Sequence, residues 1–140
     1  SKLRKNSIHL KIDIPGESIP LYGQQTKIEQ VLMNLISNAI DASQGLDLRL
    51  ISVEVHQSED SINIEVKDNG KGVEADKIDS IFQPFFTTKD ADKGTGLGLS
   101  ICQQIVDEHQ GQISVESSLG KGSTFSIYLP NKKKRISKVS

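Results

Sequence analysis

The fold is decided by residues 51–68, with the sequence ISVEVHQSEDSINIEVKD. Apolar side chains recur at every second position in two runs: Ile51, Val53 and Val55, then Ile62, Ile64 and Val66. Alternation with a period of two predicts half-buried β-strands, and the polar stretch 58–60 between the runs favours a hairpin turn. We therefore expect two adjacent strands with one face against a hydrophobic core.

Two amphipathic helices are predicted on either side of this hairpin. The first begins near Thr26, which forms a capping box with Glu29, and ends before Gly45. Its apolar stripe has helical spacing: Ile28, Val31, Leu32, Leu35, Ile36, Ala39 and Ile40. The second helix is expected over residues 97–109, with Gly111 as its stop.

Three further strands complete the predicted sheet. Residues 8–14 alternate as a half-buried strand, and strands are expected at 112–117 and 123–129. The sum is an α/β (α+β) two-layer sandwich, in which helices cover one face of a mixed, largely antiparallel sheet. We assign residues 8–130 to this domain, residues 1–7 to a linker or domain edge, and residues 131–140 to a basic tail.

Composition limits the partners. The 140 residues include 17 Lys and Arg against 18 Asp and Glu, so a net charge of −1 predicts no contact with nucleic acid or membrane. No apolar run approaches the roughly 20 residues of a membrane span. The single cysteine, Cys102, excludes an internal disulfide and favours a reducing, intracellular setting.

The first helix carries a polar stripe beside its apolar one, formed by Asn34, Asn38 and Asp41. Asparagine is a mediocre helix former, so two of them one turn apart indicate a special role. A carboxamide oxygen suits Mg²⁺, and the amide group donates to phosphate. A solvated helix edge explains the same residues equally well.

Period two places Asp68 on the apolar face of its strand, where a carboxylate needs a donor. One candidate donor is a ligand amine, and the turn Asn69–Gly72 offers close backbone approach to a flat ring. The alternative is an ordinary Asp-Asn-Gly turn whose own amides satisfy Asp68.

Residues 93–100, KGTGLGLS, hold three alternating glycines directly before the second helix. Exposed N–H groups and a helix N-terminus together favour an anion. The run lacks the Gly-Lys-Ser/Thr of a Walker loop, and Leu99 stands where a dinucleotide fingerprint requires its last glycine.

In this order, the motifs resemble the catalytic ATP-binding (HATPase_c, Bergerat-fold) domain of bacterial sensor histidine kinases, in the gyrase, chaperone and mismatch-repair superfamily. The resemblance runs from residue 30 to 130 and includes these motifs: Asn34–Ala39, Asp68–Val73, Phe82–Lys89, Gly94–Ile101 and Gly120–Phe125. It implies ATP and Mg²⁺ as ligands and a cytoplasmic location.

The resemblance also implies residue roles. Asp68 would accept a hydrogen bond from the adenine amine, supported by Ser123, while Gly70, Gly72 and Val73 would lie beside the base. Asn38 would ligate Mg²⁺, with Asn34 and Asp41 beside the phosphates. The turn before the second helix would hold the β- and γ-phosphates through Thr95, Gly96, Leu97, Gly98 and Leu99.

The loop at about 73–93 would be a mobile ATP lid. The lid contains three phenylalanines, Phe82, Phe85 and Phe86. Each either anchors the lid or docks the helical dimerisation domain that carries the acceptor histidine, and we expect one to be buried and one to dock. Lys89 would approach the γ-phosphate, although a solvated lysine is the simpler interpretation.

Asn34 separates transfer from hydrolysis, because hydrolytic relatives place a glutamate there as general base. The sequence thus favours a protein-histidine kinase domain that passes phosphate to a histidine outside this chain and serves a response regulator. His9, His56 and His109 are interpreted as surface residues. Two alternatives stay open, a non-catalytic ATP-sensing module and an anti-sigma-type protein serine kinase.

Overall fold

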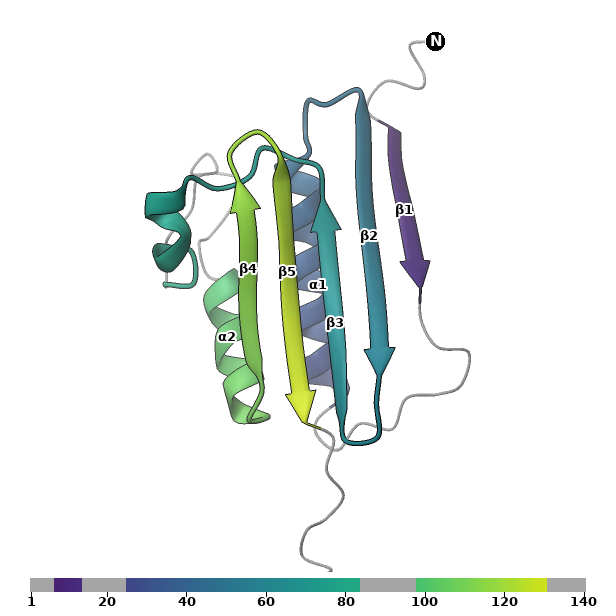
Figure 1. Ribbon diagram of the computed structural model, residues 1–140, viewed down its shortest axis with the longest axis vertical. Helices are drawn as coiled ribbons and strands as arrows, with labels where there is room; N and C mark the ends of the chain where they lie inside the picture. The colour runs from purple at the N-terminus through teal and green to yellow at the C-terminus, as the bar shows by residue number, and fades with distance from the viewer. Residues whose placement is uncertain (1–6, 14–24, 84–97, 131–140) are drawn as a thin grey trace, which may run out of the picture.

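The computed structural model describes residues 7–13, 25–83 and 98–130 of the chain. Its elements follow in this order: β1 (Ser7–Asp13), α1 (Gln25–Ala42), β2 (Leu48–Gln57), β3 (Ser61–Asp68), the short 3₁₀ helix η2 (Ala75–Ser80), α2 (Gly98–Glu108), β4 (Gln112–Ser118) and β5 (Gly122–Pro130). The strands form one sheet in the order β1-β2-β3-β5-β4. Of the strands described, only β1 and β2 pair in parallel, which confirms the predicted mixed, largely antiparallel sheet (Figure 1).

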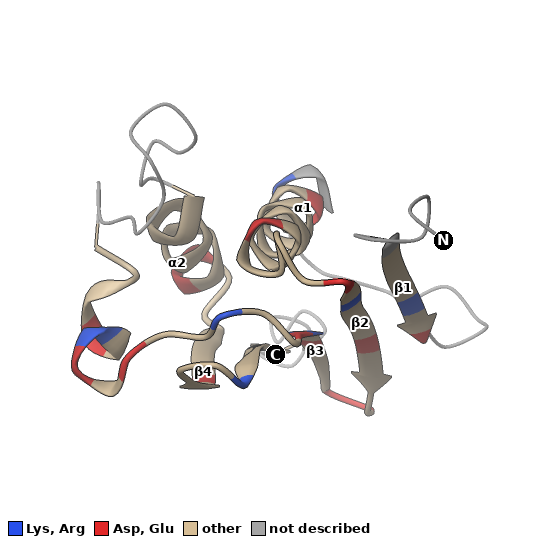
Figure 2. Cartoon of the chain, turned by 90° about the horizontal axis from the view of Figure 1, so that it is seen from above, with Lys and Arg blue, Asp and Glu red and all other residues tan. Residues whose placement is uncertain are grey.

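Both helices pack on the same face of the sheet, which confirms the two-layer architecture (Figure 2). The alternating positions of the central strands supply one side of the core: Ile51, Val53, Ile62, Ile64, Val66, Phe125, Ile127 and Leu129. The stripe of α1 supplies the other through Ile28, Val31, Leu35 and Ala39. Burying a Val, Leu, Ile or Phe side chain stabilises a fold by about 1.5–3 kcal/mol.

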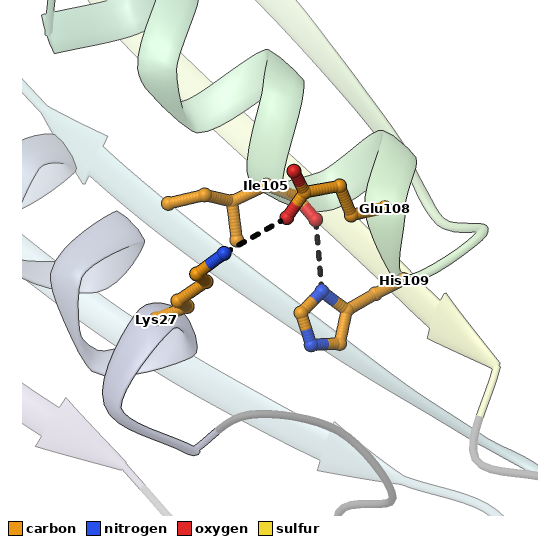
Figure 3. Close-up of polar contacts among 4 residues, drawn as sticks. All are labelled: Lys27, Ile105, Glu108 and His109. Carbon is orange, nitrogen blue, oxygen red and sulfur yellow. Dashed lines mark hydrogen bonds and ion pairs between the residues drawn. The ribbon is translucent and has the colours of Figure 1, made fainter.

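The two helices run antiparallel. Lys27 near the start of α1 pairs with Glu108 at the end of α2, with 3.3 Å between nitrogen and oxygen (Figure 3). Farther along α1, the Val31 carbonyl lies 3.8 Å from the Cys102 sulfur of α2. The C-terminal end of α1 and the N-terminal end of α2 therefore lie at the same end of the molecule, together with the end of β3 (Figure 1).

The sequence predicts His109 as a surface residue at the end of the second helix, whereas α2 ends at Glu108 and His109 follows it, half-exposed. Its Nδ1 donates a 2.8 Å hydrogen bond to the Ile105 carbonyl of the preceding turn (Figure 3). The backbone amide of His109 also donates to the Ile105 carbonyl, at 3.2 Å, so the ring and the amide of one residue together hold the last turn of α2.

The prediction of a half-buried β1 is wrong in one respect. The strand forms, but Ile8, Leu10 and Ile12 are 42%, 48% and 54% exposed. The reason is position: β1 is an edge strand that lies beyond α1 in Figure 2, so neither described α-helix covers it. Local alternation reports which side chains share a face, and whether a helix covers that face depends on the whole sheet.

The C-terminal end of α1 is held by β2. Arg49 Nη2 donates to the Ile40 carbonyl at 2.6 Å, and Arg49 Nε donates to Ser43 Oγ at 3.1 Å. A cation bonded to the last carbonyls of a helix complements the helix dipole. This contact ties the end of α1 to the strand that lies next to Asp68.

Candidate functional site

The buried carboxylate of Asp68 is the centre of the candidate site. It ends β3 on the face that packs against the helices and is only 5% exposed. The backbone amide of Gly70 donates to Asp68 Oδ1 at 2.7 Å, and the Ser123 amide bonds the same carboxylate. Burial raises the pKa of Asp68, and these two amides offset part of that rise.

The sheet register aligns two serines with this carboxylate. Asp68 pairs with Ser123 of β5, which pairs with Ser117 of β4, so the three side chains form one row. The hydroxyls of Ser117 and Ser123 lie 2.8 Å apart, and Ser117 Oγ also accepts from the Val73 amide at 2.8 Å. Among the residues described, no buried side-chain nitrogen or oxygen lacks a hydrogen-bond partner.

Packing within the protein explains why residues 70 and 72 are glycines, independently of any clearance beside a base. A Cβ on Gly70 would collide with the Ala42 carbonyl at the end of α1, and one on Gly72 would collide with the Ser118 carbonyl of β4. Gly72 also has a φ of +72°, which favours glycine. These glycines let the loop after Asp68 pack directly against α1 and β4.

The polar stripe of α1 is half-buried along its length, at Asn34, Asn38 and Asp41. Asn34 lies at the interface with α2, where its side chain hydrogen-bonds Cys102. Burial raises the pKa of the Cys102 thiol to about 11, although the Asn34 bond lowers it. Asn38 and Asp41, which lie farther along α1, are nearer the end of the helix where Asp68 lies.

The predicted phosphate loop is described only at its end. α2 begins at Gly98, as the sequence predicts to within one residue, and half-buried Leu99 packs against the core. The positive end of the α2 dipole therefore lies at the same end of the fold as Asp68. Thr95, Gly96, Leu97 and Lys89 lie outside the described residues.

The first half of the predicted lid is packed against the domain. η2 lies beside β4, and Ile81 directly after it is 4% exposed. The rings of Phe82 and Phe125 meet edge to face, with 6.3 Å between their centroids and 81° between their planes. Phe82 thus takes the anchoring role that we expected of one phenylalanine, whereas Phe85 and Phe86 lie outside the described residues.

Ser117 was not singled out in the sequence, although a signal was present. It continues the period-two alternation of Ile113 and Val115, so it occupies the inward face at the end of its strand. Asp68 and Ser123 were identified from the same signal. What the spacing does not show is that β5 brings Ser117 and Ser123 into contact.

The sheet, the buried carboxylate of Asp68 and the dipole of α2 together fit the class of nucleotide-binding proteins. Residues 23–133 match the family model described as histidine kinase-, DNA gyrase B- and HSP90-like ATPase, and the chain belongs to this family. Within the family, the chain is similar to the catalytic domain of the histidine kinase ThkA, at 34% identity and a TM-score of 0.78. That match covers 94% of this chain and 86% of the ThkA domain.

The curated relatives include a sensor histidine kinase and a sporulation kinase. The sensor histidine kinase ZraS of Escherichia coli K12 is 48% identical over 106 residues, which are 74% of this chain and 22% of ZraS. Sporulation kinase E of Bacillus subtilis is 35% identical over 89% of this chain and 16% of that kinase. The chain thus spans about a fifth of the length of these relatives. No helix in the described segments is long and apolar enough to cross a membrane.

Proposed function

We propose that this chain is the ATP-binding catalytic domain of a two-component sensor histidine kinase, which transfers the γ-phosphate of Mg-ATP to a histidine on a separate dimerisation domain. The observation that supports the proposal is the pair of buried side chains Asp68 and Ser123, which lie opposite each other on β3 and β5. A carboxylate that keeps its position in the core and accepts two backbone amides is a preorganised acceptor for the amine of adenine.

We expect the phosphates and Mg²⁺ to bind beside Asp68, at the C-terminal end of α1 and the N-terminal end of α2. Asn38, with Asn34 and Asp41 beside it, presents hard oxygen ligands of the kind that Mg²⁺ prefers. Bound there, Mg²⁺ would neutralise charge on the transferred phosphoryl group. The amides of the turn that contains Gly96 and Gly98 would hold the β- and γ-phosphates, and Lys89 would add a positive charge at the γ-phosphate.

Transfer fits this site better than hydrolysis. Asn34 has no basic atom that accepts a proton from water, and Cys102, with which it hydrogen-bonds, has a pKa of about 11 and is a neutral thiol near pH 7. Neither member of this pair therefore acts as a general base. Such a site holds ATP for a nucleophile that another domain supplies.

The helical dimerisation domain is the proposed partner for transfer, and a response regulator would receive the phosphate afterwards. Because Phe82 packs against Phe125, we assign the docking role to Phe85 and Phe86. Docking beside the lid would bring the acceptor histidine to the γ-phosphate only when the nucleotide is in place.

The test is phosphotransfer from γ-labelled ATP in the presence of the helical domain, with its acceptor histidine replaced by glutamine as the control. Acid-labile, base-stable label that disappears in the control is the expected result. Acid-stable label on serine would instead indicate the protein serine kinase. ATP binding without any label would indicate the sensing module.

A further inference from the structure

The hydroxyl of Ser117 has a complete set of hydrogen bonds that determines where its proton points. It accepts from the Val73 amide at 2.8 Å, donates to the Gly122 carbonyl at 3.1 Å, and lies 2.8 Å from the Ser123 hydroxyl. A carbonyl only accepts, so the single proton of Ser117 is committed to Gly122. A backbone N–H only donates, so the Val73 amide occupies one of the two lone pairs of Ser117 Oγ.

The 2.8 Å distance between the two hydroxyls by itself allows either oxygen to be the donor. With the single proton of Ser117 directed at the Gly122 carbonyl, the Ser123 hydroxyl donates to the second lone pair of Ser117. The only proton of Ser123 therefore points toward β4, away from Asp68. Its lone pairs are left facing the base corner, by which we mean the space beside Asp68 and the Ser123 hydroxyl that would receive the base.

This orientation makes the corner an acceptor-only surface. When ionised, the carboxylate of Asp68 offers lone pairs alone, and the Gly70 and Ser123 amides already donate to it. A ligand group that enters between Asp68 and the Ser123 hydroxyl has to be a donor. Adenine presents an amine on its six-membered ring, whereas guanine presents a carbonyl oxygen at the same position.

We propose that Ser117 is a positioning residue that orients the Ser123 hydroxyl as an acceptor and thereby sets the selection of adenine over guanine nucleotides. The inference rests on the proposed function, because it takes Asp68 and Ser123 as the base-recognising pair. The Ser117 hydroxyl also holds the amide of Val73, so the loop after the base corner is fixed by the same group.

Dissociation constants of the chain for Mg-ATP, Mg-GTP and inorganic tripolyphosphate, measured by calorimetry, test this role. In Ser117→Ala the Ser123 hydroxyl is free to rotate, so we expect the preference for ATP over GTP to fall about three- to tenfold, the range of one hydrogen bond. Tripolyphosphate binding should stay unchanged. Equal weakening of all three ligands, or an unchanged preference, would overturn the proposal.

Three further variants complete the design. Ser114→Ala removes an exposed hydroxyl from the same strand and should preserve the preference. Ser117→Thr keeps a hydroxyl and should restore it. Ser123→Ala leaves the bonds of Ser117 to Val73 and Gly122 in place and should lose the preference as Ser117→Ala does, so that preserved selectivity in this variant also overturns the proposal.

Failure of this inference differs from failure of the proposed function. If Asp68→Asn lowers the preference for ATP and Ser117→Ala does not, the base corner stands and only the role of Ser117 is wrong. If Asp68→Asn leaves the preference unchanged as well, the assignment of the base corner itself is wrong.

Discussion

Asp68 Oδ1 and the backbone amide of Gly70 are joined by a 2.7 Å hydrogen bond across the turn that ends β3. The turn itself is held by α1, since the amide of Lys71 donates to the Ala42 carbonyl at 3.0 Å. The carboxylate is therefore positioned by the backbone of two elements before any ligand arrives. A site whose groups are already oriented loses little conformational entropy on binding.

Replacing Asp68 with asparagine should weaken ATP binding by roughly ten- to hundredfold, because a charged acceptor of the adenine amine is lost. Calorimetry with Mg-ATP measures the change. Asp60→Asn is the matched control, since Asp60 is exposed in the β2–β3 turn and its replacement should leave affinity unchanged. Equal affinity in Asp68→Asn and the wild type would contradict the adenine assignment.

The buried carboxylate should also leave a signature in the pH dependence of stability. Burial raises the pKa of Asp68 above its value in the unfolded chain, so the folded state binds more protons as the pH falls toward that pKa. The free energy of unfolding of the wild type should therefore rise relative to that of Asp68→Asn as the pH is lowered. Urea unfolding of both variants between pH 7 and about pH 4 measures this difference. A fall in the free energy of unfolding of the wild type relative to Asp68→Asn on acidification would show that the pKa is lowered instead.

Asn38→Ala should abolish the dependence of phosphotransfer on Mg²⁺ concentration while preserving the binding of adenosine, because the base corner does not involve this amide. A Mg²⁺ titration of transfer and an adenosine titration by calorimetry separate the two effects. Ser37→Ala, an exposed neighbour on α1, serves as the control. Equal loss of adenosine binding and transfer would argue against a metal ligand at Asn38.

Gly70→Ala should reduce the free energy of unfolding by about 1–3 kcal/mol, because the added Cβ meets the Ala42 carbonyl. Gly98→Ala is the comparison, since a Cβ at Gly98 has no neighbour within 4 Å. Its stability should stay within about 0.5 kcal/mol of the wild type. Denaturant unfolding of both variants makes the test, and equal stability of the two would show that Gly70 is not constrained by α1.

The local elements were predictable because their patterns depend on short-range geometry. The stripe of α1 and the alternation of β3 and β5 put Val31, Val66 and Phe125 in the core, as predicted. The same periodicity identified Asp68 and Ser123 as inward-facing polar ends of strands. The exposure of Leu10 on β1 was not predictable, because it depends on how far the helices extend across the sheet.

By itself, the sequence determined which stretches form the two α-helices and the five strands and which face their side chains take, because backbone geometry sets side-chain direction within a few residues. Only the tertiary structure decided that β5 lies between β3 and β4, with Ser123 paired to Asp68 on one side and to Ser117 on the other. Strand neighbours are chosen by long-range hydrogen bonding and by packing against the helices, and local spacing carries no record of that choice.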